Sequence, residues 1–220
     1  MLAAIFVVGL CLGGCGTTPK KGGSASASAP ETTRDGLVKV DAYTGGDLYI
    51  RPDHGIGGYD SIVVAPASVF YTRTSARLDP EDEDVYLISL EQALVDQANE
   101  IGAPIVYDVG HCTIKIAIGF VNVNLAKNDK ASVLGEMILV IEYKDSMSGE
   151  SLLRLMVPEE IEREAEGVTR LEQINASFER MIDEINVTAA LRSATVVPSK
   201  PREGCKGRLL NAGLPSRSAE

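Results

Sequence analysis

Residues 111–123, HCTIKIAIGFVNV, decide the fold because apolar and small or polar side chains alternate along them. One parity carries the apolar residues Cys112, Ile114, Ile116, Ile118 and Phe120. A period of two is that of a β-strand, whose successive side chains point to opposite faces. The stretch therefore predicts a long strand with one face in a hydrophobic core.

Two more strands are predicted downstream. Residues 132–144 alternate in the same way, and residues 145–149 form a turn into a strand over 151–157. Because the two strands are so close in the chain, they are expected to form an antiparallel hairpin.

Residues 48–50 and 59–65 are also typical of strands. The second contains the continuous apolar run Ile62, Val63 and Val64, which predicts a central position in the sheet. The glycines within residues 51–58 are interpreted as a turn, because no helix follows to supply the amides of a phosphate loop.

A first helix is predicted over residues 80–101. Asp79 is a capping residue, Pro80 suits the first helical position, and acidic residues follow at the positive end of the helix dipole. Its apolar stripe is Leu87, Leu90, Leu94, Ala98 and Ile101. The acidic cluster lacks the spacing of an EF-hand, so no calcium site is predicted.

A second helix is predicted from Thr169 to near Arg192. Thr169 and Glu172 have the spacing of a capping box. The helix carries the strongest apolar stripe in the chain, Leu171, Ile174, Phe178, Met181, Ile182, Ile185 and Ala189.

These elements predict one α+β domain over residues 48–192. It has a mixed, largely antiparallel sheet of about four to five strands with two helices packed on one face. Strand 59–65, the first helix and strand 111–123 are expected to form a right-handed crossover, and the other sheet face is expected to be more polar. Residues 15–47 and 193–220 lack apolar periodicity and are predicted to be a disordered tether and a disordered tail.

The N-terminus resembles a bacterial lipoprotein signal peptide. Residues 2–12 form an apolar run of about eleven residues, well below the roughly 20 that span a bilayer. The lipobox is Leu12, Gly13, Gly14 and Cys15. This predicts a signal peptide over 1–14 and lipid on Cys15. No Lys or Arg precedes Cys15, which is compatible with a natural start upstream of Met1.

The order of elements also resembles a known family. The segments YDSIVVAPASVFY, GHCTIKIAIGFVNVN and EYKDSMSGESLL are similar to those of bacterial envelope lipoproteins catalogued as domain of unknown function 3313. The resemblance covers residues 48–192. It implies an envelope lipoprotein with an α+β domain, and it brings no catalytic residues.

Cys112 and Cys205 are the cysteines left for pairing once the signal is removed and Cys15 is lipidated. The oxidising periplasm favours a disulfide between them. Cys112 also lies on the apolar parity of its strand, where a buried free thiol is the alternative.

No catalytic, metal or cofactor site is predicted. His54 and His111 lack the spacing that places two imidazoles on one metal. Glu136 and Glu142 share a strand face but lie about 20 Å apart, too far for joint acid and base work. Nothing in the sequence favours convergence of Asp108, His111 and Ser132 into a catalytic group.

The formal charge of −10 argues against a nucleic-acid partner. The anchor predicts a protein in the cell envelope, and Gly16 after the lipidated Cys15 favours the periplasmic side of the outer membrane in the lipoproteins it resembles. The expected function is non-enzymatic binding or assembly with envelope partners. The alternative is a periplasmic domain that binds a small ligand or a glycan between sheet and helices. The oligomeric state is left open.

Overall fold

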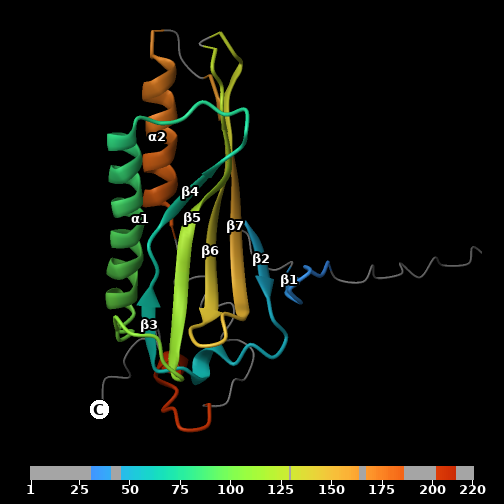
Figure 1. The fold of residues 1–220 in the computed structure, drawn as a ribbon, viewed down its shortest axis with the longest axis vertical. Helices are drawn as coiled ribbons and strands as arrows, with labels where there is room; N and C mark the ends of the chain where they lie inside the picture. Colours follow the sequence, from blue (N-terminus) through green and yellow to red (C-terminus); the bar gives the residue numbers. More distant parts are fainter. Residues whose placement is uncertain (1–30, 41–45, 129, 164–166, 186–201, 212–220) are drawn as a thin grey trace, which may run out of the picture.

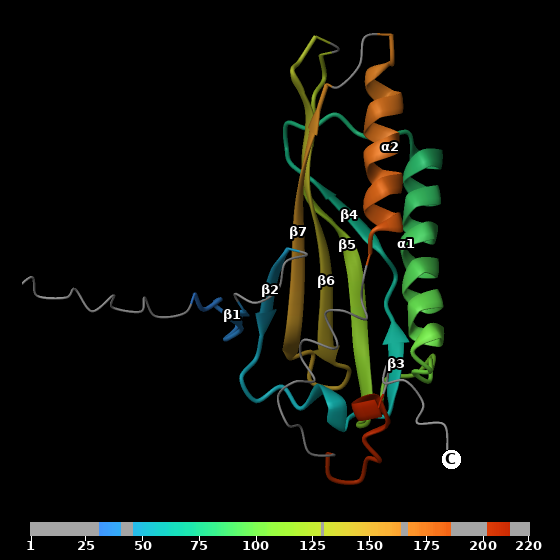
Figure 2. The same cartoon turned by 180° about the vertical axis from the view of Figure 1, so that it is seen from behind.

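The computed structural model describes residues 31–40, 46–128, 130–163, 167–185 and 202–211. They form a seven-stranded mixed sheet, ordered β1-β2-β7-β6-β5-β3 with β4 also paired to β5. Two helices lie side by side along one face of the sheet (Figures 1 and 2). The elements are β1 (Val38–Val40), β2 (Asp47–Ile50), η1 (Ile56–Gly58), β3 (Ser61–Val64), β4 (Ser68–Tyr71), α1 (Pro80–Glu100), β5 (Thr113–Leu125), β6 (Val133–Asp145), β7 (Ser151–Glu162), α2 (Arg170–Asp183) and η2 (Arg208–Asn211).

The mixed sheet and the two helices on one face agree with the sequence, but the predicted strand count was too low. The strands that the sequence missed, β1 and β4, have three and four residues, too few for alternation to show. β3 and β4 run parallel to β5, and the other pairings are antiparallel.

The prediction of a central position for β3 was wrong. Within the described residues, β3 lies at the end of the strand order, and β5 is its one partner among the named strands. Its outer edge is covered by the chain after α1. The N–H of Ile62 donates to Pro104 O at 2.9 Å, and the N–H of Val106 donates to Ile62 O at 2.8 Å. This cover explains an apolar run in an edge strand.

β7 is longer than predicted, and β5 has the predicted length but begins and ends two residues later. In β5 the register shifts between Val121 and Asn124, and Asn122 has a φ of 54°. This bulge moves the buried parity from Phe120 to Val123 and Leu125, so the strand continues two residues beyond its predicted end at Val123. β7 continues through Pro158. The pairing of β7 with β2 ends at Met156, so the N–H that Pro158 lacks is not needed for a hydrogen bond to β2.

The first helix has the predicted start, with the Asp79 side chain accepting from the N–H of Glu81. The capping box between Thr169 and Glu172 is also confirmed. α2 ends at Asp183, earlier than the predicted Arg192, and Leu171 is 44% exposed rather than buried. Ala189 lies outside the described residues.

The two helices and the sheet share one core. The Phe178 ring stacks on Tyr86 of α1 with centroids 5.1 Å apart, and it meets the edge of Phe120 of β5 at 4.6 Å. All three residues are buried. Neither helix among the described residues has the combination of length and hydrophobicity that a membrane span requires.

Two segments assigned to disordered termini pack against the domain. The N-terminal segment, residues 31–37, buries Leu37 completely. The C-terminal segment, residues 202–211, places Leu209 in the core with 3% exposure, and Leu209 N–H donates to Tyr59 O at 3.0 Å. Each segment is held by a single buried residue and by backbone hydrogen bonds. Such contacts leave no apolar periodicity in the sequence, so the packing of these segments was not predicted. Residues 1–30, 41–45, 186–201 and 212–220 lie outside the residues that the structure describes.

Candidate functional site

The basal end of the sheet, where β5 begins and β6 ends, gathers a buried carboxylate, a tyrosine and an arginine. Asp145 is the last residue of β6 and is 5% exposed. Its Oδ1 accepts hydrogen bonds from the N–H groups of Met147 at 3.0 Å and Ser148 at 2.8 Å. Its Oδ2 accepts from the Tyr59 hydroxyl at 2.8 Å and from the Arg202 guanidinium.

These contacts fix the protonation states of the group. Burial alone would raise the pKa of Asp145, but the bonds from Ser148, Arg202 and Tyr59 outweigh it and hold that pKa well below its usual range. Burial and the Asp145 charge raise the pKa of the Tyr59 hydroxyl far above its usual value. Near neutral pH the aspartate is ionised and the tyrosine is protonated, so neither is poised for proton transfer.

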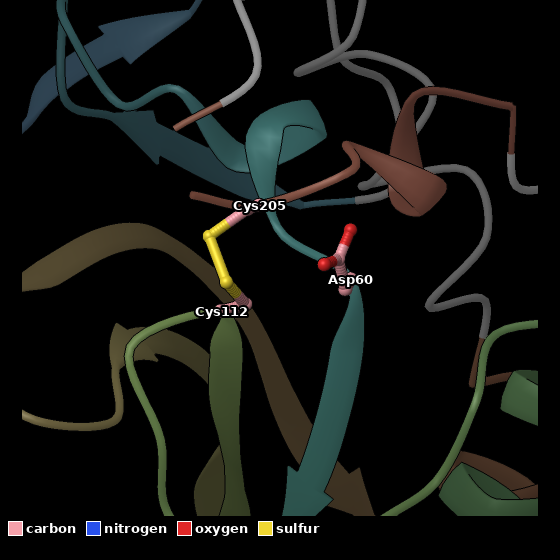
Figure 3. A group of neighbouring side chains, drawn as sticks. All are labelled: Asp60, Cys112 and Cys205. Carbon is pink, nitrogen blue, oxygen red and sulfur yellow. A yellow bond between two sulfur atoms is a disulfide. The ribbon is translucent and has the colours of Figure 1, made fainter. Parts of the chain in front are cut away.

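The C-terminal segment closes over this group. The Arg202 guanidinium lies over the Tyr59 ring, 4.5 Å from its centroid. Cys205 forms a disulfide with Cys112, the residue before β5, with Cα atoms 5.6 Å apart. The Asp60 carboxylate lies beside the disulfide (Figure 3) and accepts from the backbone N–H of Lys206 at 2.9 Å.

Asp60, Cys112 and Cys205 bring their ligating atoms within 4.8 Å of one another. Such a cluster would suit a metal ion if the sulfurs were thiolates, because the thiolate is the metal-binding form. The disulfide removes that form. This arrangement holds two segments of chain together and offers no metal site in its oxidised state.

A polar cleft of about 470 Å³ opens beside the group. Its charged lining includes Arg51, whose Nε donates to Ser151 O at 2.8 Å and whose Nη2 donates to Asp35 O at 2.7 Å. The ring of His54 also lines it, and its Nδ1 accepts from the N–H of Ile56 at 3.0 Å. The remaining lining residues are Asp53, Gly55, Tyr59, Asp145, Met147, Ser148, Glu150, Leu152 and Arg202.

The sheet face opposite the helices, here called the open face, carries a second candidate site. Cross-strand register places Val121 beside Ile138 and Pro158 on this face, and Val140 beside Met156 in the next row. These five residues, together with Phe70, form what we call the apolar band. Phe70 alternates with the core-packed Val69 and Tyr71 of β4 and is 60% exposed.

The apolar band lies between two charged rows. Toward the distal end of the sheet, Glu136 of β6 faces Glu160 of β7, and both are exposed. Toward the basal end, Lys115 of β5 faces Lys144 of β6. The open face is therefore polar at both ends, as expected, but apolar at its centre.

The N-terminal segment covers one flank of the open face. Arg154 of β7 pairs with Asp35 at 2.6 Å and with Glu142 of β6. The Tyr49 hydroxyl donates to Glu31 at 3.3 Å. This network holds the Glu142 carboxylate, which lies six positions along β6 from Glu136.

The residues singled out in the sequence are not brought together. The ring of His111 contacts Glu203 O at 2.9 Å at the basal end. Ser132 precedes β6 at the distal end, and the 13 residues of β6 between the two ends span about 40 Å. The lipobox residues Leu12, Gly13 and Gly14 and the lipidation residue Cys15 lie outside the described residues.

The sequence did not reveal the basal group. Tyr59, Asp145 and Arg202 come from three distant places in the chain. Asp145 alone had a local signal, because an Asp that opens a turn commonly accepts from backbone N–H groups two and three residues on. Arg202 lies in a stretch of glycines, prolines and scattered charges with no pattern to mark it.

The fold defines the class to which the chain is assigned: a two-layer domain in which two helices cover one face of a mixed sheet. No protein-family model matches the chain, so membership of the family named above stays a prediction. No curated protein matches it either.

Several solved structures are similar to part of the chain. A minor lipoprotein from Acinetobacter baumannii is 14% identical, with 64% of this chain and 98% of that one covered and a TM-score of 0.35. A putative neuraminyllactose-binding hemagglutinin homolog from Helicobacter pylori is 10% identical, covers 63% and 90%, and has a TM-score of 0.36. The PelC dodecamer from Paraburkholderia phytofirmans is 10% identical, covers 54% and 81%, and has a TM-score of 0.31. At these values the likeness carries no argument about fold or function.

Proposed function

We propose that this protein is a non-enzymatic lipoprotein of the cell envelope that binds a protein partner through its open face. The observation that carries the proposal is the apolar band, which crosses four strands at the centre of the sheet face opposite both helices of the described residues (Figure 1). An exposed apolar patch with a polar rim is typical of a protein-binding surface.

The anchor is the second part of the proposal. A diacylglyceryl group on Cys15 holds a protein stably at a bilayer, whereas one acyl chain binds only marginally. The described chain starts at residue 31 and enters the sheet at its β1 edge. Residues 16–30 would then connect the domain to the membrane. The Gly16 that follows the lipidated residue supports the outer membrane as the destination.

A binding role without catalysis is supported by the state of the basal group. Its carboxylate and its arginine are each committed to contacts that join the β6–β7 turn to the C-terminal segment. Arg51 similarly joins the β7 backbone to the N-terminal segment. These charges are used to hold the chain in place.

A second candidate function is the binding of a small polar ligand or a glycan in the basal cleft. Its volume of about 470 Å³ lies within the range of ligand pockets, about 300–1,000 Å³. The lining is charged and includes the aromatic ring of Tyr59. A smaller hollow of about 210 Å³ lies between β7 and α2.

Two measurements test the proposal. Labelled fatty acid should enter the wild-type chain and not Cys15→Ser, and the wild type should fractionate with the outer membrane. A photo-crosslinking residue at Val140 should capture protein in the native envelope, whereas the same residue at Ile88, which is 68% exposed on α1, should not. Equal capture at both positions, or no label in the wild type, would contradict the proposal.

A further inference from the structure

The disulfide between Cys112 and Cys205 has a carboxylate beside it, that of Asp60 (Figure 3). One oxygen of Asp60 and the two sulfur atoms all lie within 4.8 Å of one another. Reduction would turn both sulfurs into thiols, whose ionised form binds metal ions. Whether the three groups then stay together depends on the other contacts of the segments that carry them.

Asp60 and Cys112 are joined through the backbone. Cys112 O accepts hydrogen bonds from the N–H groups of Asp60 at 2.8 Å and of Ser61 at 3.2 Å. These bonds lie at the start of the parallel pairing of β3 with β5, whose first pair is Ser61 with Thr113. The pairing does not depend on the disulfide, so Asp60 and Cys112 remain neighbours in the reduced protein.

Cys205 is held beside them by contacts on both of its sides. On one side, the backbone N–H of Lys206 donates to the Asp60 carboxylate at 2.9 Å. On the other side, the Arg202 guanidinium donates to Asp145, and the N–H of Cys205 itself donates to Arg202 O at 2.9 Å. The position of Cys205 is therefore fixed by contacts other than the S–S bond.

From this arrangement we propose that the reduced protein binds a zinc ion through the thiolates of Cys112 and Cys205 and the carboxylate of Asp60. The disulfide and the zinc ion would then hold the same two segments of chain in alternative redox states. Two sulfur ligands and one carboxylate oxygen suit Zn²⁺, which prefers a tetrahedral site, and water would take the fourth position. The inference goes beyond the proposed function and does not depend on it.

The space between the cysteines can accommodate the ion. Two sulfurs bound to one zinc lie about 3.8 Å apart, because each Zn–S bond is about 2.3 Å long and the site is tetrahedral. Rotation about the Cα–Cβ bonds reaches this separation from Cα atoms that are 5.6 Å apart. All three residues are partly exposed, so an ion can reach them from the solvent.

Asp60 is positioned and ionised for this role by the C-terminal segment. Hydrogen bonds from the backbone N–H groups of Lys206 and Arg208 lower the pKa of Asp60. The carboxylate is therefore charged near neutral pH. Carboxylates that bind metal ions are commonly held in place by such hydrogen bonds.

The two forms interconvert in balanced steps. An external dithiol attacks the disulfide and releases both cysteines as thiols, while the dithiol is itself oxidised to a disulfide. Zn²⁺ then displaces the two thiol protons into the solvent and forms two Zn–S bonds and one Zn–O bond. An oxidising envelope favours the disulfide, so the zinc form is expected where a dithiol reductant acts on the protein.

The test uses the full chain with Cys11→Ser and Cys15→Ser, which leaves Cys112 and Cys205 as its only cysteines. A phosphine reduces the protein without adding a competing thiol, and Zn²⁺ is titrated against a chromophoric chelator. The reduced protein should bind zinc about a hundredfold or more tightly than the oxidised protein, because only thiolates are ligands. Co²⁺ in place of Zn²⁺ should give the absorption of a tetrahedral ion with thiolate ligands.

Substitutions of Asp60 separate the proposed site from binding by the thiols alone. Asp60→Asn keeps an oxygen that accepts from Lys206 but loses the charge, so the zinc affinity should fall about tenfold or more. Asp60→His supplies a different zinc ligand and should bind more tightly than Asp60→Asn. The control Asp108→Asn removes an exposed carboxylate from the loop before Cys112 and should leave the affinity unchanged.

Thermal unfolding gives a second readout. Zn²⁺ should raise the melting temperature of the reduced protein and leave that of the oxidised protein unchanged, because a ligand of the folded state stabilises it. Equal zinc affinity of the reduced and oxidised proteins, or of the reduced protein and Cys205→Ser, would overturn the site. So would a reduced Asp60→Asn variant that binds as tightly as the wild type, because the two thiols alone would then account for the binding.

Discussion

Arg202 donates a hydrogen bond to the carboxylate of Asp145, 57 positions earlier in the chain, and so ties the C-terminal segment to the β6–β7 turn. The aspartate is almost fully buried, whereas the arginine side chain is 29% exposed. The pair therefore joins a buried carboxylate to a guanidinium that is partly exposed to water. Its contribution to the stability of the fold depends on Asp145 remaining ionised.

Asp145→Asn should lower the free energy of unfolding by about 1–3 kcal/mol, because it weakens the bonds to Arg202 and to the N–H groups of the turn. Urea denaturation measures the change. Glu150→Gln is the matched control, since Glu150 pairs with Arg51 at the surface and its loss should cost less than about 0.5 kcal/mol. Equal effects of the two substitutions would contradict a special role for Asp145.

The free energy of unfolding should fall as the pH drops from about 4 to about 2. Hydrogen bonds from Thr33 and Arg154 lower the pKa of Asp35 to about 2. A group with a lowered pKa in the folded state contributes stability above its unfolded pKa of about 4 and loses it as the pH falls through the folded value. Asp145 shifts in the same direction. Asp145→Asn should therefore flatten the pH dependence, and an unchanged slope would count against this assignment.

Cys205→Ser should destabilise the protein by about 2–4 kcal/mol, because the disulfide closes a loop with a sequence separation of 93. Wild-type protein treated with dithiothreitol should unfold at the same denaturant concentration as the variant. The variant treated with dithiothreitol is the control and should not change further. A variant as stable as the oxidised wild type would show that the C-terminal segment is held by its other contacts.

Phe178→Ala should cost about 3–5 kcal/mol, because the ring fills the space between Tyr86 of α1 and Phe120 of β5. Leu171→Ala, in the first turn of the same helix, is the control. Leu171 is 44% exposed, so its loss should change stability by less than about 0.5 kcal/mol. Thermal unfolding followed by circular dichroism would distinguish the two, and similar losses would mean that α2 packs differently.

Thr169→Ala should cost about 1 kcal/mol through the loss of the capping box, in which Thr169 Oγ1 accepts from the N–H of Glu172 at 3.2 Å. Thr169→Ser keeps the accepting oxygen and should retain most of the stability. Chemical denaturation of the three proteins measures the difference. A serine variant as unstable as the alanine variant would assign the effect to the lost methyl group.

Periodicity explains what the sequence predicted well. The 13-residue strands β5 and β6 alternate long enough for their faces to be assigned, and Asp79 and Thr169 mark helix starts with local chemistry. The edge position of β3 was not predictable, because its covering segment comes from residues 104–106 beyond α1. The apolar residues of a strand indicate that it is buried, but they do not indicate which distant segment of the chain covers it.

The basal group and the packing of the terminal segments could not be predicted from periodicity, because contacts between distant single residues hold them. The C-terminal segment has one core residue, Leu209, one disulfide and several backbone hydrogen bonds to Tyr59 and Asp60. None of these produces a repeating pattern. The apolar band was hidden for a different reason: its members alternate with core residues, so apolar side chains occur on both parities of these strands and the exposed set does not stand out.

The disulfide divides the chain into two parts that respond differently to mechanical tension. The closed ring from Cys112 to Cys205 contains β5, β6, β7 and α2, and no pulling force can extend it while the bond is intact. The part before the ring continues into it along the backbone at Cys112 but is packed against it by noncovalent contacts alone, and β1 meets β2 through only three residue pairs. A load applied at residue 31 would peel this part away first. Unfolding of this part would release about 80 residues, which extend to roughly 270 Å, and the extension would then stop at the ring.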